Sequence, residues 1–122
     1  MYESQRTFKA YLDDGAADID SNRPAQRGYE PTVVVVFRSD QLTDSGAVVD
    51  EGDLVGLGTY LTDGIGAEVR EVFSLPLTEE RLARHFFGWC MAHLPRSLPD
   101  RLAEIRVSQT PYTNAVYRES ES

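Results

Sequence analysis

The sequence has very little cysteine and histidine: Cys90 is the single cysteine of the 122 residues, and His85 and His93 are the two histidines. One cysteine excludes an intrachain disulfide and a metal cluster built from cysteines. The histidines stand eight residues apart with no HExxH-like pattern, which on a helix leaves them about two turns apart. They are interpreted as surface or helix-end side chains. Neither a metal site nor a cofactor is expected.

Long apolar runs and clusters of basic residues are also absent. No stretch of 18 apolar residues is available to span a membrane, and residues 1–6 lack the apolar run of a signal peptide. The 12 basic residues are outnumbered by 20 acidic ones, and the resulting net charge of −8 repels nucleic acids. We therefore expect a soluble, cytoplasmic protein whose partners include neither a membrane nor a nucleic acid.

The length and composition fit one small domain over residues 1–122. The hydrophobic fraction of 41% is enough for a core, although a core of this size gains from association with other subunits. Residues 13–31 contain Asp, Gly, Asn and Pro and predict a long loop, of the kind that is often functional. Residues 119–122 predict a frayed tail.

The first half of the chain has three candidate strands. Apolar residues alternate with polar ones over residues 6–12, which is typical of a half-buried strand. Residues 32–37 include four successive valines and predict a strand covered on both faces. Polar turn residues then lead to an Ala-Val-Val segment at 47–49, and together these segments predict an antiparallel hairpin.

Two helices and two further strands are predicted in the second half. Acidic residues at 50–53 favour a helix start, but four glycines weaken that helix and predict an irregular C-terminal half. The next helix begins after the N-cap Thr78 and ends at Pro95, with one apolar stripe. Its members are Leu82, Phe86, Cys90 and Leu94. Cys90 is therefore interpreted as a buried apolar residue rather than a nucleophile.

The C-terminal strands complete an α+β arrangement with antiparallel strands. Ile105, Val107 and Gln109 alternate on one face of a strand, Pro111 breaks it, and residues 112–118 predict its return partner. Gly-X-Gly pairs occur near residues 56–66, but neither has the third glycine of a dinucleotide fingerprint in a parallel unit. A nucleophile-elbow sequence is absent as well.

Three segments, in matching order and spacing, resemble the 6-pyruvoyl-tetrahydropterin synthase and 6-carboxy-tetrahydropterin synthase family. Residues 46–54 (GAVVDEGDL) resemble the family's Gly-Met-Val-Val-Asp-Phe-Gly-Asp-Leu segment, and residues 77–83 (LTEERLA) resemble its Pro-Thr-Ala-Glu-Asn-Leu-Ala helix start. Residues 108–118 (SQTPYTNAVYR) resemble its closing Glu-Thr-Pro and Val-Tyr-Arg strand pair. The resemblance implies a tunnelling fold: a four-stranded antiparallel sheet with two helices on one face, assembled into trimeric or hexameric rings.

The same resemblance exposes departures in the pocket that it implies. Arg27 and Tyr29 fall where the family has the His-Gly-His zinc ligands, and Ala17 lies near the position of the first zinc-binding histidine. Arg23 lies near the position of the catalytic cysteine, and Gln109 replaces the glutamate that anchors a pterin. Zinc needs about three imidazole or anionic ligands, which this set lacks. An amide offers one acceptor and two donors and suits a neutral, amide-like partner.

These departures predict a metal-independent cyclase, lyase or isomerase that acts on a small, neutral, ring-containing metabolite of a biosynthetic pathway. Its candidate site residues are the substrate-binding Thr78, Glu80, Gln109 and Thr110 and the catalytic Arg27 and Tyr29. Arg27 would supply positive charge, and Tyr29 would act as a phenolic acid or base. Two alternatives stay open: a non-catalytic binding or assembly module, and a zinc-dependent pterin synthase.

Overall fold

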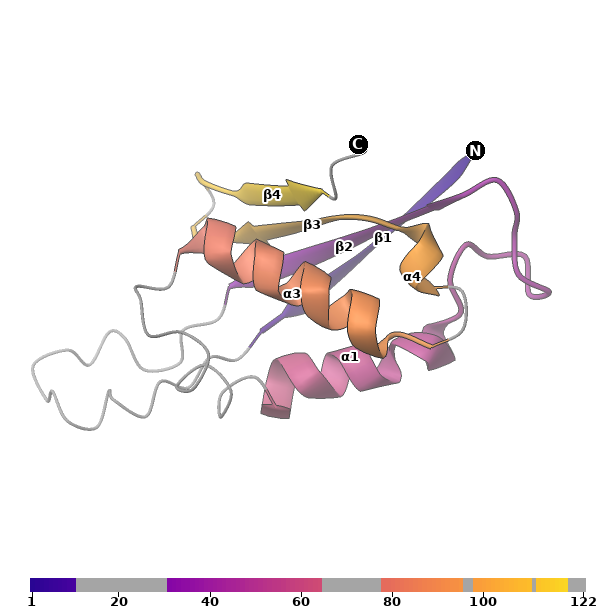
Figure 1. Cartoon of the computed structure of the whole chain (residues 1–122), viewed down its shortest axis with the longest axis horizontal. Helices are drawn as coiled ribbons and strands as arrows, with labels where there is room; N and C mark the ends of the chain where they lie inside the picture. The colour runs from indigo at the N-terminus through magenta and orange to yellow at the C-terminus, as the bar shows by residue number, and fades with distance from the viewer. Residues whose placement is uncertain (11–30, 65–77, 96–97, 111, 119–122) are drawn as a thin grey trace, which may run out of the picture.

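The computed structural model of the chain describes residues 1–10, 31–64, 78–95, 98–110 and 112–118 (Figure 1). Its strands and helices follow one another as β1 (Tyr2–Lys9), β2 (Thr32–Ser39), the 3₁₀ turn η3 (Glu51–Leu54), α1 (Val55–Thr59), the π-helical η4 (Tyr60–Gly64), α3 (Glu79–His93), α4 (Leu98–Arg101), β3 (Leu102–Ser108) and β4 (Ala115–Arg118). Separate helices beside antiparallel strands confirm the predicted α+β class.

The described strands form one four-stranded antiparallel sheet in the order β1-β2-β3-β4. The valine-rich β2 lies inside the sheet, between β1 and β3, where β-branched side chains pack well. β1 begins at Tyr2, earlier than the alternation at 6–12 predicts, and residues 11 and 12 lie outside the described ranges. The C-terminal strand pair is confirmed, although β4 begins at Ala115 rather than at residue 112.

The prediction of a strand at residues 47–49 is wrong. Both edges of β2 are already paired, with β1 and β3, so β2 has no free edge left for a hairpin partner. The segment instead follows a turn in which Gly46 adopts a positive φ of 85°, a conformation that favours glycine. Val48 and Val49 are nevertheless buried in the core, and Arg101 donates a hydrogen bond to the Val48 carbonyl over 2.7 Å.

The helices α1 and α3 pack against the same face of the sheet (Figure 1), as predicted. Alternation along β2 turns Val33, Val35 and Phe37 toward these helices. Each helical segment contributes buried apolar side chains to the core. They are Leu54, Leu57 and Leu61 from the first segment, and Leu82, Phe86, Cys90 and Leu94 from the second and its C-cap. Within the described part of the chain, no helix has the length and apolar character needed to cross a membrane.

The two predicted helices differ in regularity, as expected. The first is a succession of 3₁₀, α and π turns from Glu51 to Gly64, so its glycine-rich sequence does not sustain one hydrogen-bonding pattern. The second, α3, is a regular helix of 15 residues. The Arg81 amide donates to the Thr78 hydroxyl at its N-terminus over 3.2 Å, which confirms the predicted N-cap.

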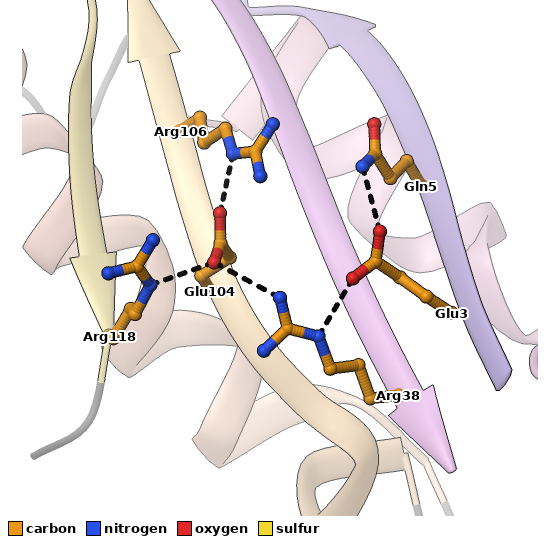
Figure 2. A network of polar contacts seen from close by, with 6 residues as sticks. All are labelled: Glu3, Gln5, Arg38, Glu104, Arg106 and Arg118. Atoms are coloured by element: carbon orange, nitrogen blue, oxygen red, sulfur yellow. Dashed lines mark hydrogen bonds and ion pairs between the residues drawn. The ribbon is translucent and has the colours of Figure 1, made fainter. Parts of the chain in front are cut away.

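A charged network lies on the opposite face of the sheet, which the helices leave uncovered (Figure 2). Its centre is Glu104 of β3, whose side chain is completely buried beneath the arginines that contact it. Arg106 and Arg118 donate to its two oxygens over 2.5 and 2.8 Å, and an Arg38 nitrogen lies 3.6 Å away. Arg38 also donates to Glu3. In the described part of the chain, arginine side chains rather than helices thus cover the part of this face around Glu104.

Candidate functional site

A groove of about 440 Å³ lies at one end of the sheet, where three strands and the connection between β3 and β4 meet. Hydroxyl and amide side chains dominate its lining. The lining residues are Lys9, Thr32, Ser108, Gln109, Thr110, Tyr112, Thr113 and Asn114. Two of the predicted substrate-binding residues, Gln109 and Thr110, therefore come together in one concave site.

The strand ends form one side of the groove. Thr32 pairs with Lys9 on one neighbouring strand and with Ser108 on the other, so the three residues lie in one row across the sheet. Alternation places this row on the face opposite the helices, because Val33 and Val107 point into the core. The Lys9 ammonium donates to the Thr32 hydroxyl over 2.7 Å and brings a positive charge to the groove.

The connection from β3 to β4 forms the other side. The Thr110 and Thr113 hydroxyls lie 3.0 Å apart, and the Tyr112 amide donates to the Thr110 hydroxyl over 3.2 Å. These bonds tie together the described residues of the turn between β3 and β4. The Gln109 side chain is exposed, so its amide group is accessible to a ligand in the groove.

Glu79, which the sequence pattern did not indicate, links this turn to the start of α3. Its Oε2 accepts hydrogen bonds from the Gln109 backbone amide over 2.6 Å and from the Thr113 hydroxyl over 2.8 Å. A carboxylate in a first helical turn has a general explanation in the helix dipole. The helix dipole alone does not predict these tertiary contacts, in which Glu79 bonds to residues that follow it by 30 and 34 positions in the sequence.

The other predicted site residues lie elsewhere. Thr78 caps α3, and Glu80 is exposed on its first turn; neither lines the groove. Arg27 and Tyr29 lie outside the described residues. Among the described residues, no three His, Cys, Asp or Glu side chains gather as metal ligands. The guanidinium and phenol at positions 27 and 29 do not fit the donor set that zinc requires.

The two histidines lie beside aromatic side chains, and the cysteine is buried in the core. The His85 ring is 2.7 Å from the Tyr60 hydroxyl, and Trp89 stacks between Tyr60 and His93 at ring distances of 4.2 and 4.6 Å. Burial raises the pKa of the Cys90 thiol to about 12, so this thiol stays protonated at neutral pH and is a poor nucleophile. The interpretation of Cys90 as a buried apolar residue is confirmed.

A solved structure shares this arrangement of strands and helices. The chain is similar to the 6-pyruvoyl tetrahydropterin synthase of Caenorhabditis elegans, with a TM-score of 0.62 over 98% of this chain and 94% of that chain. The sequence identity is 18%, a level at which the likeness concerns the fold. No protein-family model matches the chain, and no curated protein matches it in sequence. The chain thus has the α+β fold of a 6-pyruvoyl tetrahydropterin synthase.

Proposed function

We propose that this chain is a metal-independent enzyme, a cyclase, lyase or isomerase, that binds a small, neutral, ring-containing metabolite in the groove at the end of the sheet. Gln109 and Thr110 hold the ring edge. Arg27 and Tyr29 supply the positive charge and the phenolic acid or base. Thr78 and Glu80 keep their proposed substrate-binding role from the start of α3, outside the groove lining. The zinc-dependent alternative is disfavoured because positions 27 and 29 lack zinc-binding side chains.

The observation that carries this proposal is the place of Gln109 on the wall of the groove. The resemblance to the pterin synthases puts a glutamate at this position, and two acceptor oxygens of a carboxylate suit two adjacent N–H donors. The amide of Gln109 offers a carbonyl acceptor beside an N–H donor. It therefore suits a ring edge in which an N–H stands next to a carbonyl, as in a lactam or an imide.

Matched ring compounds test this specificity. With the C2–N3 edge of the ring facing Gln109, pteridine-2,4-dione presents a carbonyl beside the ring N–H, whereas pterin presents an amino group beside that N–H. The opposite edge, N3–H beside the C4 carbonyl, is the same in both compounds. We expect the wild-type protein to bind the dione about tenfold more tightly than pterin, because a mismatched edge leaves polar groups without partners. Gln109→Glu should reverse the preference. The measurement is isothermal titration calorimetry with both compounds and both proteins.

The control for the Gln109→Glu substitution is Gln109→Ala, which should weaken the binding of both compounds without reversing the order of their affinities. Equal binding of the two compounds by wild-type protein, unchanged in Gln109→Glu, contradicts the proposed role of Gln109. The same titrations with Arg27→Ala and Tyr29→Phe test the proposal that both residues act in turnover rather than in binding. Both variants should therefore retain the wild-type affinity.

A non-catalytic binding module is the second candidate, because the described groove lining contains no carboxylate and its charged group is Lys9. Such a lining can hold a ligand, but it offers no carboxylic acid or base for proton transfer. A module of this kind would bind ring compounds without converting them. Unchanged ligand recovered from stoichiometric complexes after prolonged incubation would favour the module over the enzyme.

We also propose that the chain forms a ring-shaped trimer or hexamer through its sheet edges. In the described part of the chain, β1 and β4 each pair on one side only, and exposed strand edges readily pair with another chain. Native mass spectrometry should show a multiple of three chains, with any retained ligand or metal in the same spectrum. Replacing Thr7 on β1 by proline should dissociate the assembly, and a fully monomeric wild-type spectrum would contradict the proposal.

A further inference from the structure

We infer that Glu79 is a positioning residue that sets the orientation of Gln109, and thereby the ligand preference of the groove. The inference rests on the proposed role of Gln109 in ligand binding. It gives the start of α3 a function in the site, because Glu79 binds two residues of the groove lining without lining the groove itself. Glu79 touches the turn rather than the ligand, and so acts through its neighbour.

The geometry indicates a clamp with two points of attachment. A single carboxylate oxygen accepts from the Gln109 backbone amide over 2.6 Å and from the Thr113 hydroxyl over 2.8 Å. Hydrogen bonds to an ionised acceptor are shorter and stronger than neutral ones. Because the first bond fixes the peptide group that precedes Gln109, it also fixes the direction in which the Gln109 side chain leaves the backbone. The second bond holds the far end of the same turn.

The base of this clamp is firmly anchored. Glu79 lies in the first turn of the 15-residue helix α3, directly after the capping residue Thr78. Five residues of this helix, including Leu82 and Phe86, are buried against the sheet. Glu79 is itself partly buried, so its side chain has fewer accessible rotamers. The turn that carries Gln109 is thus tied to the most regular helix of the fold, and this arrangement preorganises the groove wall.

A purely local role for Glu79 makes a different prediction. If its charge served only the helix dipole, Glu79→Gln would lose as much ligand affinity and as much protection of the Gln109 amide as Glu79→Ala. A glutamine at this position keeps a carbonyl oxygen that accepts from both the Gln109 amide and the Thr113 hydroxyl. For a positioning residue, Glu79→Gln should therefore rescue most of what Glu79→Ala loses.

The test combines a structural and a binding measurement. In Glu79→Ala we expect the Gln109 amide to exchange its hydrogen about tenfold faster by NMR, and pteridine-2,4-dione to bind about fivefold more weakly. Glu79→Gln should stay within about twofold of wild type in both. Asp44→Asn, a charge removal in the exposed turn after β2, should leave both unchanged.

Each outcome has one meaning. Unchanged exchange at Gln109 in Glu79→Ala overturns the inference, even if the wild-type protein does not bind the dione. Equal losses in Glu79→Gln and Glu79→Ala also overturn it and assign Glu79 to the helix dipole. Faster exchange without any wild-type binding of the dione supports the positioning role and contradicts the proposed function instead.

Discussion

Replacing Glu104 by alanine should lower the free energy of unfolding by about 3 kcal/mol, because it removes the centre of the charged network on the helix-free face. The carboxylate is completely buried and holds three guanidinium groups together. Without it, Arg38, Arg106 and Arg118 repel one another. Because these arginines are partly exposed, water relieves some of that repulsion, and the loss stays at the low end for a broken buried pair.

The same network makes stability depend on pH. Burial by itself raises the pKa of Glu104, but hydrogen bonds from Arg118 and Arg106, together with their charges, outweigh it and hold the pKa below the usual value of 4.5. A carboxylate with a depressed pKa in the folded state stabilises the fold above its unfolded pKa. That stabilisation is lost as the pH falls through the folded pKa. Glu104→Gln should therefore flatten the acid limb of the stability curve.

Urea unfolding followed by circular dichroism, repeated between neutral and acidic pH, measures both effects. Glu51→Ala is the matched control, because Glu51 is 77% exposed and its ion pair with Arg6, whose side chain is 28% exposed, lies outside the network. It should cost about 0.5 kcal/mol. A loss below about 1 kcal/mol in Glu104→Ala would show that the network contributes no more than surface ion pairs do.

Replacing Phe86 by alanine should lower the free energy of unfolding by about 4 kcal/mol. Phe86 is 1% exposed and lies in the middle of the apolar stripe of α3, where it packs into the core with the inward residues of β2 and β3. Truncation removes the apolar contacts of the ring and leaves a cavity that the packed sheet cannot fill. For a small domain with a total stability of about 5–15 kcal/mol, this loss threatens folding itself.

Phe86→Leu provides a milder measurement if the alanine variant does not fold. It should cost about 1.5 kcal/mol, since most of the apolar volume remains. Met91→Ala on the exposed side of the same helix should change stability by less than about 0.5 kcal/mol. Chemical denaturation gives all three values. Similar losses for Phe86→Leu and Met91→Ala would contradict a central role of Phe86 in the core.

Local patterns predicted those parts of the fold whose structure depends on neighbouring residues. The valines of β2, the apolar stripe of α3 and the N-cap Thr78 each combine a propensity with a periodicity, and the structure bears them out. The segment at 47–49 has the composition of a strand, yet it does not form one. A strand needs a partner strand with a free edge. β2 has no free edge, because it pairs with β1 on one side and with β3 on the other, and both partners are far from residues 47–49 in sequence.

Some residues of the candidate site were likewise predictable from local sequence, and others were not. Gln109 and Thr110 were identifiable because the motif that contains them is continuous in sequence, and both line the groove. Lys9 and Thr32 reach the same groove only through strand register. Glu79 had an adequate local explanation as an acidic residue in a first helical turn, so its link to the turn between β3 and β4 had no signal of its own.

The order of residues alone determined the α+β class, the central strand, the regular helix and the exclusion of disulfides, because these depend on composition or on contacts within a few residues. The tertiary structure decided which carboxylate meets which partner. Glu104 and Glu79 have ordinary sequence surroundings, but strand pairing brings arginines from β2 and β4 over the first, and helix packing brings the Gln109 amide to the second. Charge pairing acts over a few ångströms of space, whatever the separation along the chain.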